Sequence, residues 1–516
     1  MSINQDREKY VQQHILLQED QESDTTNNAQ EQQKIKKASF DILLTGSQVK
    51  YNNDYDDDKI KRDSNKNDDD QVTFDDILSK IGFGRYQIAI FVMMGFVGIA
   101  DAPMINDHWD LKTYQNSIMV SLVFTGYMIG SFTSGKISDK YGRKKPLVYA
   151  SVGLFLSAIL SAFAFEFISF TILRTIFGGF VGFIVPISFS VLAETTPVKQ
   201  RGVILALVGI FYTFGELFVC LLAFLTLDNL KTGNWRLLLA LSTIPSFLIM
   251  VLSYFFLNES PRFCLFDDKE EQAFQLIEQI CQINRTQSPI DHSNKQKLIL
   301  WADKMKKQSQ QFEKGSIKSL FEKSFKKVTP IIWYNWFVSS FVFFGITFIL
   351  PITLTKLNKN DDNGDDDLLS IFFSSLGELP TIFVCAIIVN VPFLGRKNSW
   401  AIAFAGGFIG CLLIYLELGS FTFWVSFSKL ALDLAFTLSY EYTGEIYPTK
   451  IRAEGMGMAG SFSRIGSIIM PWIGNYIGDI GVFLPYFIFS ICCALASLLT
   501  FLLPFETRGQ SLDTFS

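Results

Sequence analysis

The chain has 516 residues, of which 49% are hydrophobic and 18% are charged, whereas soluble domains carry roughly 25% charged residues. Its net charge of −5 gives no reason to expect a nucleic-acid partner, and the composition excludes a soluble globular domain. The charges collect at the start of the chain, in the stretch 258–328 and in short loops. Between them lie apolar runs of about 20 residues, the length that an α-helix needs to cross a bilayer. The sequence therefore predicts a polytopic, all-α membrane protein.

The first 85 residues divide into two parts. Residues 1–70 are rich in Gln, Asn, Asp and Lys, which predicts a disordered polar tail. The tail has no apolar signal-peptide core, so the first span must direct the chain to the membrane. In residues 71–85, Phe74, Ile77 and Leu78 recur at helical spacing. We expect a short amphipathic helix there, lying in the membrane interface.

Twelve apolar runs follow in two groups of six. Residues 86–257 form the first predicted bundle, 258–328 a polar insert, 329–503 the second bundle and 504–516 a second tail. Within the insert, the spacing of Ala273, Phe274 and Ile277 predicts an amphipathic helix that braces the two halves. A flexible linker is the alternative. The predicted spans are 86–106, 117–138, 146–165, 168–194, 203–226, 235–257, 329–352, 368–390, 398–417, 421–444, 455–477 and 482–503.

The distribution of basic residues over the loops orients these spans. The loop after the second span carries Lys136, Lys140, Arg143, Lys144 and Lys145, and the other loops on that side are also basic. The opposite loops are acidic or sparsely charged, as in the segment 357–367. Because basic loops remain in the cytoplasm, we expect both termini and the insert to be cytoplasmic.

The segment "GKISDKYGRKK" (135–145) closes the second span and opens the third. Its glycines permit a tight turn, and Asp139 can pair with a neighbouring base. The pattern resembles the loop motif of the major facilitator superfamily, and two groups of six spans agree with that fold. The resemblance implies that Gly135, Asp139, Gly142 and Arg143 form a cytoplasmic latch that opens and closes during transport. In the second half, "NVPFLGRKN" lacks the Asp, which puts the equivalent latch in doubt.

Four further segments resemble motifs shared by sugar porters and organic-ion transporters. They are "RTIFGGFVGFIVPISFSVLAETTPVKQRG", "NESPRF", "YTGEIYPTKIRAEGMG" and "PFETRG". The resemblance implies salt-bridge networks that gate the cytoplasmic side. The alternative is a set of exposed ion pairs, each worth less than about 1 kcal/mol. The gating residues implied are Glu194, Arg201, Glu259, Arg262, Glu445 and Arg452.

The seventh span lacks the Gln-Gln pair of sugar porters. The segments "IGFGRYQ", "ADAPMIND" and the Trp-rich seventh span instead look like the synaptic-vesicle-two-related branch, which adjoins the organic cation and anion transporters. Two departures stand out. The loop after the first span is short, and Met104 stands where that branch often has a Glu.

Lys429 and Asp433 lie inside the predicted tenth span, about 12 Å and 18 Å from its outer end. Four residues apart on a helix, they share a face and can pair. Charges at this depth are expensive and usually functional, and transporters bind their solutes near the midplane. We expect the pair to line the cavity, with Lys429 exchanging Asp433 for a substrate carboxylate. A self-neutralising structural pair is the alternative.

Other charges and rings complete the predicted binding site. Arg464 lies between small residues of the eleventh span, and the related transporters carry Arg there. Arg174 either binds the solute or reaches the interface. Trp336 and Phe344 can stack on a flat solute or face lipid. Three membrane carboxylates that could carry a proton are Asp101, which is the first choice, Glu216 and Glu378.

The sequence shows no catalytic set, no metal-binding cluster, no cofactor motif and no nucleotide loop. We therefore expect a monomeric secondary transporter of a small organic solute, most readily an organic anion moved with protons by alternating access. An organic cation, a sugar or another uncharged metabolite is the alternative within transporters. A non-transporting receptor or vesicle regulator is the alternative from another class. The membrane is either the plasma membrane or that of an intracellular vesicle.

Overall fold

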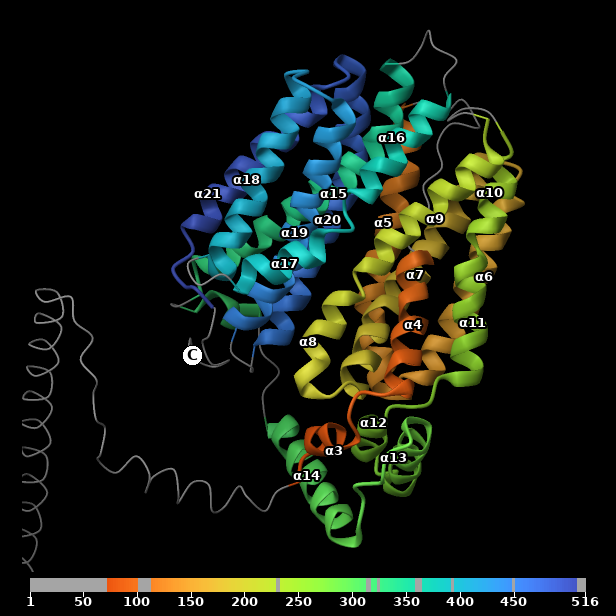
Figure 1. Cartoon of the computed structure of the whole chain (residues 1–516), viewed down its shortest axis with the longest axis vertical. Coiled ribbons are helices and arrows are strands. Elements are labelled where there is room, and N and C mark those ends of the chain that lie inside the picture. The colour runs from red at the N-terminus through yellow and green to blue at the C-terminus, as the bar shows by residue number, and fades with distance from the viewer. Residues whose placement is uncertain are drawn as a thin grey trace, which may run out of the picture. The chain divides into compact units, whose positions relative to one another are not determined.

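The computed structural model describes residues 72–100, 113–228, 233–311, 317–322, 325–357, 364–390, 394–447 and 451–507. Asp101, the tail 1–70 and most of the C-terminal tail lie outside these ranges. The described part is all-α. Its N half contains α4 to α11 and its C half contains α15 to α21 (Figure 1). Three helices of the insert separate the two halves along the chain.

The helices of the N half follow the predicted spans, with two of the spans interrupted. They are α4 (Arg85–Ala100), α5 (Thr113–Tyr141), α6 (Lys144–Ala162), α7 (Phe167–Thr195), α8 (Val198–Leu207), α9 (Ile210–Thr226), α10 (Trp235–Ser242) and α11 (Ile244–Phe256). The fifth expected span is divided into α8 and α9, and the sixth into α10 and α11.

The helices of the C half are α15 (Val328–Leu357), α16 (Gly364–Leu376), α17 (Thr381–Asn390), α18 (Gly395–Tyr415), α19 (Phe421–Ile446), α20 (Arg452–Ile480) and α21 (Leu484–Phe501). The eighth expected span is broken between α16 and α17, at the sequence Gly377-Glu378-Leu379-Pro380. Proline removes a backbone donor and ends the regular helix. The break therefore places Glu378 at a turn inside the bundle.

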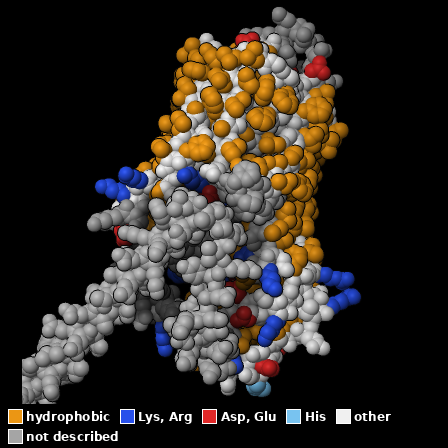
Figure 2. Space-filling model, turned by 60° about the vertical axis from the view of Figure 1, so that its left-hand side comes forward, with side chains coloured by type: hydrophobic (Ala, Val, Ile, Leu, Met, Phe, Trp, Pro, Cys, Tyr) orange, Lys and Arg blue, Asp and Glu red, His pale blue; other side chains and the backbone are white. Residues whose placement is uncertain are grey.

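Nine helical segments of the described residues are long and apolar enough to cross a membrane, and the bent pair of α3 (Phe74–Ile81) and α4 makes a tenth. The two expected spans outside this set are the broken α16–α17 and the polar α20, which packs along α15 and α5. The arrangement is consistent with twelve spans. Figure 2 shows apolar side chains over the bundle and the Lys and Arg side chains toward one end, with acidic side chains also at the other end.

The insert and α3 lie together at one end of the bundle, which we call the insert end; the opposite end is the far end (Figure 1). The insert contains α12 (Pro261–Phe266), α13 (Glu270–Asn284) and α14 (His292–Gln311), followed by the short helix η1 (Ile317–Phe321). Asn284 accepts a hydrogen bond from the backbone N of Tyr86 and donates one to Gln87, each at 2.9 Å. These bonds join α13 to α4 of the N half.

The predicted amphipathic helix is present as α3 (Phe74–Ile81), but its apolar face does not lie in lipid as expected. Phe74, Ile77 and Leu78 are at most 1% exposed, because they pack in one core with α12 to α14. Thr73 caps the helix by accepting a hydrogen bond from the backbone N of Asp76. The predicted amphipathic helix is therefore present, but its apolar face packs against protein and not against lipid.

Four glycines bring α5 and α7 of the N half together. A Cβ on Gly130 would collide with the backbone of Gly179, and a Cβ on Gly182 would collide with the backbone of Tyr127. Gly126 and Gly178 make equally close approaches. Small residues permit this backbone contact between helices in a membrane.

Candidate functional site

Three charged side chains meet where the two halves touch. Lys429 Nζ on α19 lies 2.7 Å from Glu216 Oε2 on α9, and 2.6 Å from Glu378 Oε1 in the break between α16 and α17. The side chains of Lys429, Glu216 and Glu378 are 1%, 6% and 0% exposed. Ser375 donates a hydrogen bond of 2.8 Å to the same oxygen of Glu216. We call Lys429, Glu216 and Glu378 the triad.

The triad corrects the expected Lys429–Asp433 pair. Asp433 lies one helical turn from Lys429 and is partly buried, but the ion pairs of Lys429 among the described residues are with Glu216 and Glu378. Sequence spacing favoured the neighbour on the same helix. The fold instead supplies a carboxylate 213 residues away along the chain. Lys429 is thus held by two acids and is not available to bind a solute anion in this conformation.

One ammonium against two carboxylates leaves one formal negative charge in excess when all three groups are ionised. Oε1 of Glu216 and Oε2 of Glu378 are buried and have no hydrogen-bond partner in the described structure. A buried charge without a partner is strongly unfavourable. Each carboxylate of the triad therefore depends on Lys429, and one that loses this cation is suited to take up a proton.

Arg464 on α20 lies across the boundary between the halves from Tyr127 on α5. Its guanidinium carbon is 3.7 Å from the centroid of the Tyr127 ring, within the range of a cation–π contact. No carboxylate in the described ranges forms an ion pair with Arg464. Arg464 therefore retains its capacity to bind an anion.

Aromatic rings also meet across the same boundary. Phe124 and Phe344 lie with their ring centroids 5.1 Å apart, and Tyr212 and Phe343 lie 6.1 Å apart. The predicted ring Trp336 is different, because it is 2% exposed and donates a hydrogen bond to Thr443 inside the C half. Phe344 thus lies at the expected boundary, whereas Trp336 packs within one half.

Arg174, the remaining predicted binding residue, lies among aromatic rings of the N half. It is 7% exposed on α7, and its guanidinium lies 5.0 Å from the Phe177 ring and 5.7 Å from the Phe170 ring. The structure thus places it among rings of its own helix in the N half.

Hydrogen bonds join the halves near the far end. Ser117 and Ser121 of α5 donate to the backbone oxygens of Pro471 and Ile468 on α20, at 3.0 and 2.7 Å. Asn475 donates to Ser117 in return, at 2.9 Å. Together with the triad, these contacts hold the far end closed.

At the insert end, none of the ion pairs among the described residues joins the N half to the C half. In the N half, Arg143 pairs with Asp139 at 2.8 Å and with Glu194 at 3.1 Å. Glu259 accepts hydrogen bonds from the backbone N of Arg143 and of Lys144. Burial opposes the charge on Arg143, but Glu194 and Asp139 outweigh that effect and raise the pKa of Arg143 above its usual value.

The C half repeats this arrangement with one change. Glu506 accepts hydrogen bonds from the backbone N of Arg396 and of Lys397, at 2.8 and 3.1 Å. Arg396 pairs with Glu445 at 2.7 Å and lies 3.7 Å from Glu441. Glu441 on α19 thus supplies the second carboxylate that Asp139 supplies in the N half, although no motif in the sequence pointed to it.

The other predicted gating residues have different partners. Arg201 pairs with Asp75 of α3 at 2.6 Å, so α3 contributes a carboxylate that was not predicted from the sequence. Arg452 donates to the backbone oxygen of Tyr447, and Arg262 packs against the rings of Phe266 and Trp301. Gly142 has φ +89° beside Glu259, whereas a Cβ on Gly135 would meet nothing within 4 Å.

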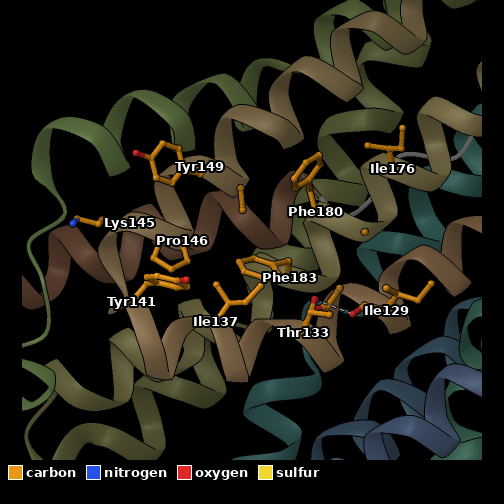
Figure 3. Close-up of a pocket in the computed structure, with 13 residues that line it drawn as sticks. Ile129, Thr133, Ile137, Tyr141, Lys145, Pro146, Tyr149, Ile176, Phe180 and Phe183 are labelled. Atoms are coloured by element: carbon orange, nitrogen blue, oxygen red, sulfur yellow. Dashed lines mark hydrogen bonds between the residues drawn. The ribbon is translucent and has the colours of Figure 1, made fainter. Parts of the chain in front are cut away.

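A groove of about 670 Å³ lies elsewhere, on the side of the N half (Figure 3). It is lined by α5, α6 and α7, including Ile129, Phe180 and Tyr149, with Lys145 at its insert end. Its walls are nearly all apolar and belong to one half. This groove suits a lipid chain better than a polar solute that must pass between the halves.

Comparisons with known proteins identify the family and the fold. The family described as "Sugar (and other) transporter" matches residues 39–516. The synaptic vesicle 2-related protein of Bos taurus is 30% identical over 477 residues, covering 87% of this chain and 83% of the relative. The organic cation/carnitine transporter 7 of Arabidopsis thaliana is 29% identical over 503 residues, covering 86% and 96%.

Solved structures share the fold. The inward open conformation of the xylose transporter XylE from E. coli has a TM-score of 0.62 at 20% identity, covering 83% of this chain and 97% of that one. A D-xylose-proton symporter has a TM-score of 0.61 at 21% identity, covering 83% and 100%. The matched family and these two structures are of membrane transporters and not of enzymes. The chain belongs to the sugar (and other) transporter family and is a multi-pass transporter of the major facilitator fold.

Proposed function

We propose that the chain moves a small organic anion together with protons by alternating access. The observation that carries this proposal is Arg464, a base between the two halves that no described carboxylate neutralises. A guanidinium binds a carboxylate through two charge-assisted hydrogen bonds. A charge at this depth in the bilayer marks a functional site.

The rings at the boundary between the halves favour a solute with a flat or apolar part. Phe124, Phe344, Tyr212 and Phe343 come from both halves, so a solute between them contacts both. Aromatic faces stabilise a flat solute by offset stacking. Such a solute is displaced from one half when the halves separate.

The triad supports proton coupling, because its carboxylates outnumber its one ammonium. One structural neighbour is a D-xylose-proton symporter, so proton coupling is named for a protein of this fold. Protonation of one carboxylate removes the excess negative charge. Proton occupancy and the contact between the halves are thus linked at one place.

The gating network supports alternating access with the insert end in the cytoplasm. The basic loops lie at that end, as the positive-inside rule requires. Arg143 and Arg396 each anchor a network inside one half, so the halves can separate there without breaking either. The synaptic vesicle 2-related relatives favour an intracellular vesicle membrane over the plasma membrane.

An organic cation is the second candidate. The excess of acid around Lys429 favours it, with Asp433 one turn away. The name of the Arabidopsis relative refers to organic cations and carnitine. A cation that displaced Lys429 from Glu216 would find two carboxylates already placed.

The test is uptake by the purified full chain in liposomes with an imposed pH gradient. Labelled aromatic carboxylates, choline and glucose are compared, with protein-free liposomes subtracted. Carboxylate uptake that falls at least tenfold in Arg464→Ala and partly recovers in Arg464→Lys supports the proposal. Choline uptake supports the second candidate, and glucose uptake contradicts both. If none of the three solute classes is taken up, the result favours a non-transporting receptor.

A further inference from the structure

The triad joins residues that must separate when the far end opens. Glu216 is on α9 of the N half, whereas Lys429 and Glu378 belong to the C half. Ser375 of the C half also donates to Glu216. Movement of the halves apart at the far end therefore removes Glu216 from Lys429 and leaves Glu378 in place.

Asp433 is placed to succeed Glu216. It lies four residues after Lys429 on α19, so the two move together and share a helix face. It is partly buried, and it lies within electrostatic range of both Lys429 and Glu216. The ion pairs of the described structure nevertheless leave it out of the triad.

We propose that Lys429 exchanges Glu216 for Asp433 when the far end opens, and that the released Glu216 binds the coupled proton. This inference rests on the proposed transport by alternating access and names the proton-binding residue within it. In each state Lys429 keeps two carboxylates. Glu216 changes between the ion pair with Lys429 and a protonated, neutral form.

The charges that face this junction fit the exchange. From α9 come Glu216 and the thiol of Cys220, from the helix break comes Glu378, and from α19 come Lys429 and Asp433. Lys429 is the cation among these groups, so it cannot neutralise all three acids together. Glu216 is buried, so when it is separated from Lys429 it is stabilised in the bilayer by taking up a proton. Asp433 is only partly buried in the described structure and stays ionised there, so the two states differ by one proton.

The proton follows a defined direction. With the far end open, Glu216 takes a proton from water on that side and becomes neutral. The far end then closes around the solute. The proton leaves to the insert side, and the ionised Glu216 pairs again with Lys429, as the described structure has it. One proton moves from the far side to the insert side in each cycle.

The exchange can be tested without any solute. Spin labels attached through a non-natural amino acid at positions 165 and 480 report the separation of the halves at the far end. Phe165 is 86% exposed in the N half, and Ile480 is 76% exposed in the C half. Distances are measured by pulsed electron resonance in lipid nanodiscs between pH 5.5 and 8.5.

Acid should raise the far-open fraction of the wild type, because Glu216 binds its proton in that state. Glu216→Gln should be far-open at every pH. Asp433→Asn should lower the far-open fraction at least fivefold, because Lys429 then has no second partner there, and Asp433→Glu should restore it. Asp479→Asn is the matched control, since Asp479 pairs with Lys356 inside the C half and should leave the distances unchanged.

The exchange is overturned if Asp433→Asn keeps the wild-type far-open fraction or raises it. It is also overturned if Glu216→Gln keeps the pH response of the wild type. Uptake by the wild type separates the two proposals. If no solute is taken up but the distances shift as described, the exchange stands and transport fails. If carboxylates are taken up but Asp433→Asn changes no distance, the exchange alone fails.

Discussion

Lys429 Nζ lies 2.7 Å from Glu216 Oε2, although the two residues belong to opposite halves of the bundle. Glu378 holds the same ammonium from its other side at 2.6 Å. The ion pairs fix α19 against both α9 and the break between α16 and α17. The same charged groups therefore stabilise the bundle and, as we propose, take part in transport.

Replacement of Lys429 by Met should destabilise the protein, because two buried carboxylates would lose their shared cation. Breaking a buried ion pair by removing one partner costs about 3–5 kcal/mol. The measurement is thermal unfolding of the purified protein, followed by tryptophan fluorescence. The triple variant Lys429→Met, Glu216→Gln, Glu378→Gln should recover part of the loss. A single variant as stable as the wild type would show that the triad is not ionised.

Glu441→Gln tests whether Glu441 replaces the missing latch Asp of the C half. Its oxygen lies 3.7 Å from Arg396, whereas that of Glu445 lies at 2.7 Å. Both carboxylates are partly exposed, so each pair contributes about 1 kcal/mol or less. We expect Glu441→Gln to lower the unfolding temperature by less than Glu445→Gln does, and both to slow uptake. A larger loss in Glu441→Gln would contradict this order.

Gly182 and Gly135 provide a matched pair of glycines on neighbouring helices. A Cβ at Gly182 would collide with the backbone of Tyr127, and a Cβ at Gly135 would meet open space. Gly182→Val should separate α5 from α7 and destabilise the N half by more than about 2 kcal/mol, as overpacking does. Gly135→Val should fold normally. Monodisperse yield in detergent is the measurement, and equal yields would refute the close approach.

Arg143 should not act as a pH sensor. The pKa of Arg143 is raised, because Glu194 and Asp139 outweigh its burial. A raised pKa keeps the proton bound until the pH rises above it, so Arg143 stays charged throughout the physiological range. The pH dependence of uptake should therefore keep its midpoint in Arg143→Lys, with a lower rate. A shifted midpoint in that variant would place the sensor at the insert end.

The fold could be predicted from local properties of the sequence. Apolar runs of membrane length, basic loops on one side and the segment around Asp139 all act over short distances along the chain. The α16–α17 break is also visible in the sequence, since Gly377 and Pro380 flank Glu378. The importance of this break could not be predicted, because the cation that Glu378 meets comes from another helix.

The site could be predicted as a set of residues but not as a set of partners. Lys429, Glu216, Glu378 and Arg464 were each identified as charges inside a span. Which carboxylate meets Lys429 depends on the rotation of three helices, and hydropathy does not encode that rotation. The nearest acid along the chain, Asp433, was therefore the wrong partner for this conformation. Glu441 left no local signal, because it belongs to no motif.

Joint movement of an organic anion and protons is tested most directly by a pH-sensitive dye trapped in liposomes that contain the purified chain. No gradient is imposed, and an aromatic carboxylate is added outside. We predict that the interior acidifies with the wild type, but not with Arg464→Ala or with protein-free liposomes. Labelled carboxylate that enters without acidification, or acidification driven by choline or glucose instead, would contradict proton-linked anion transport.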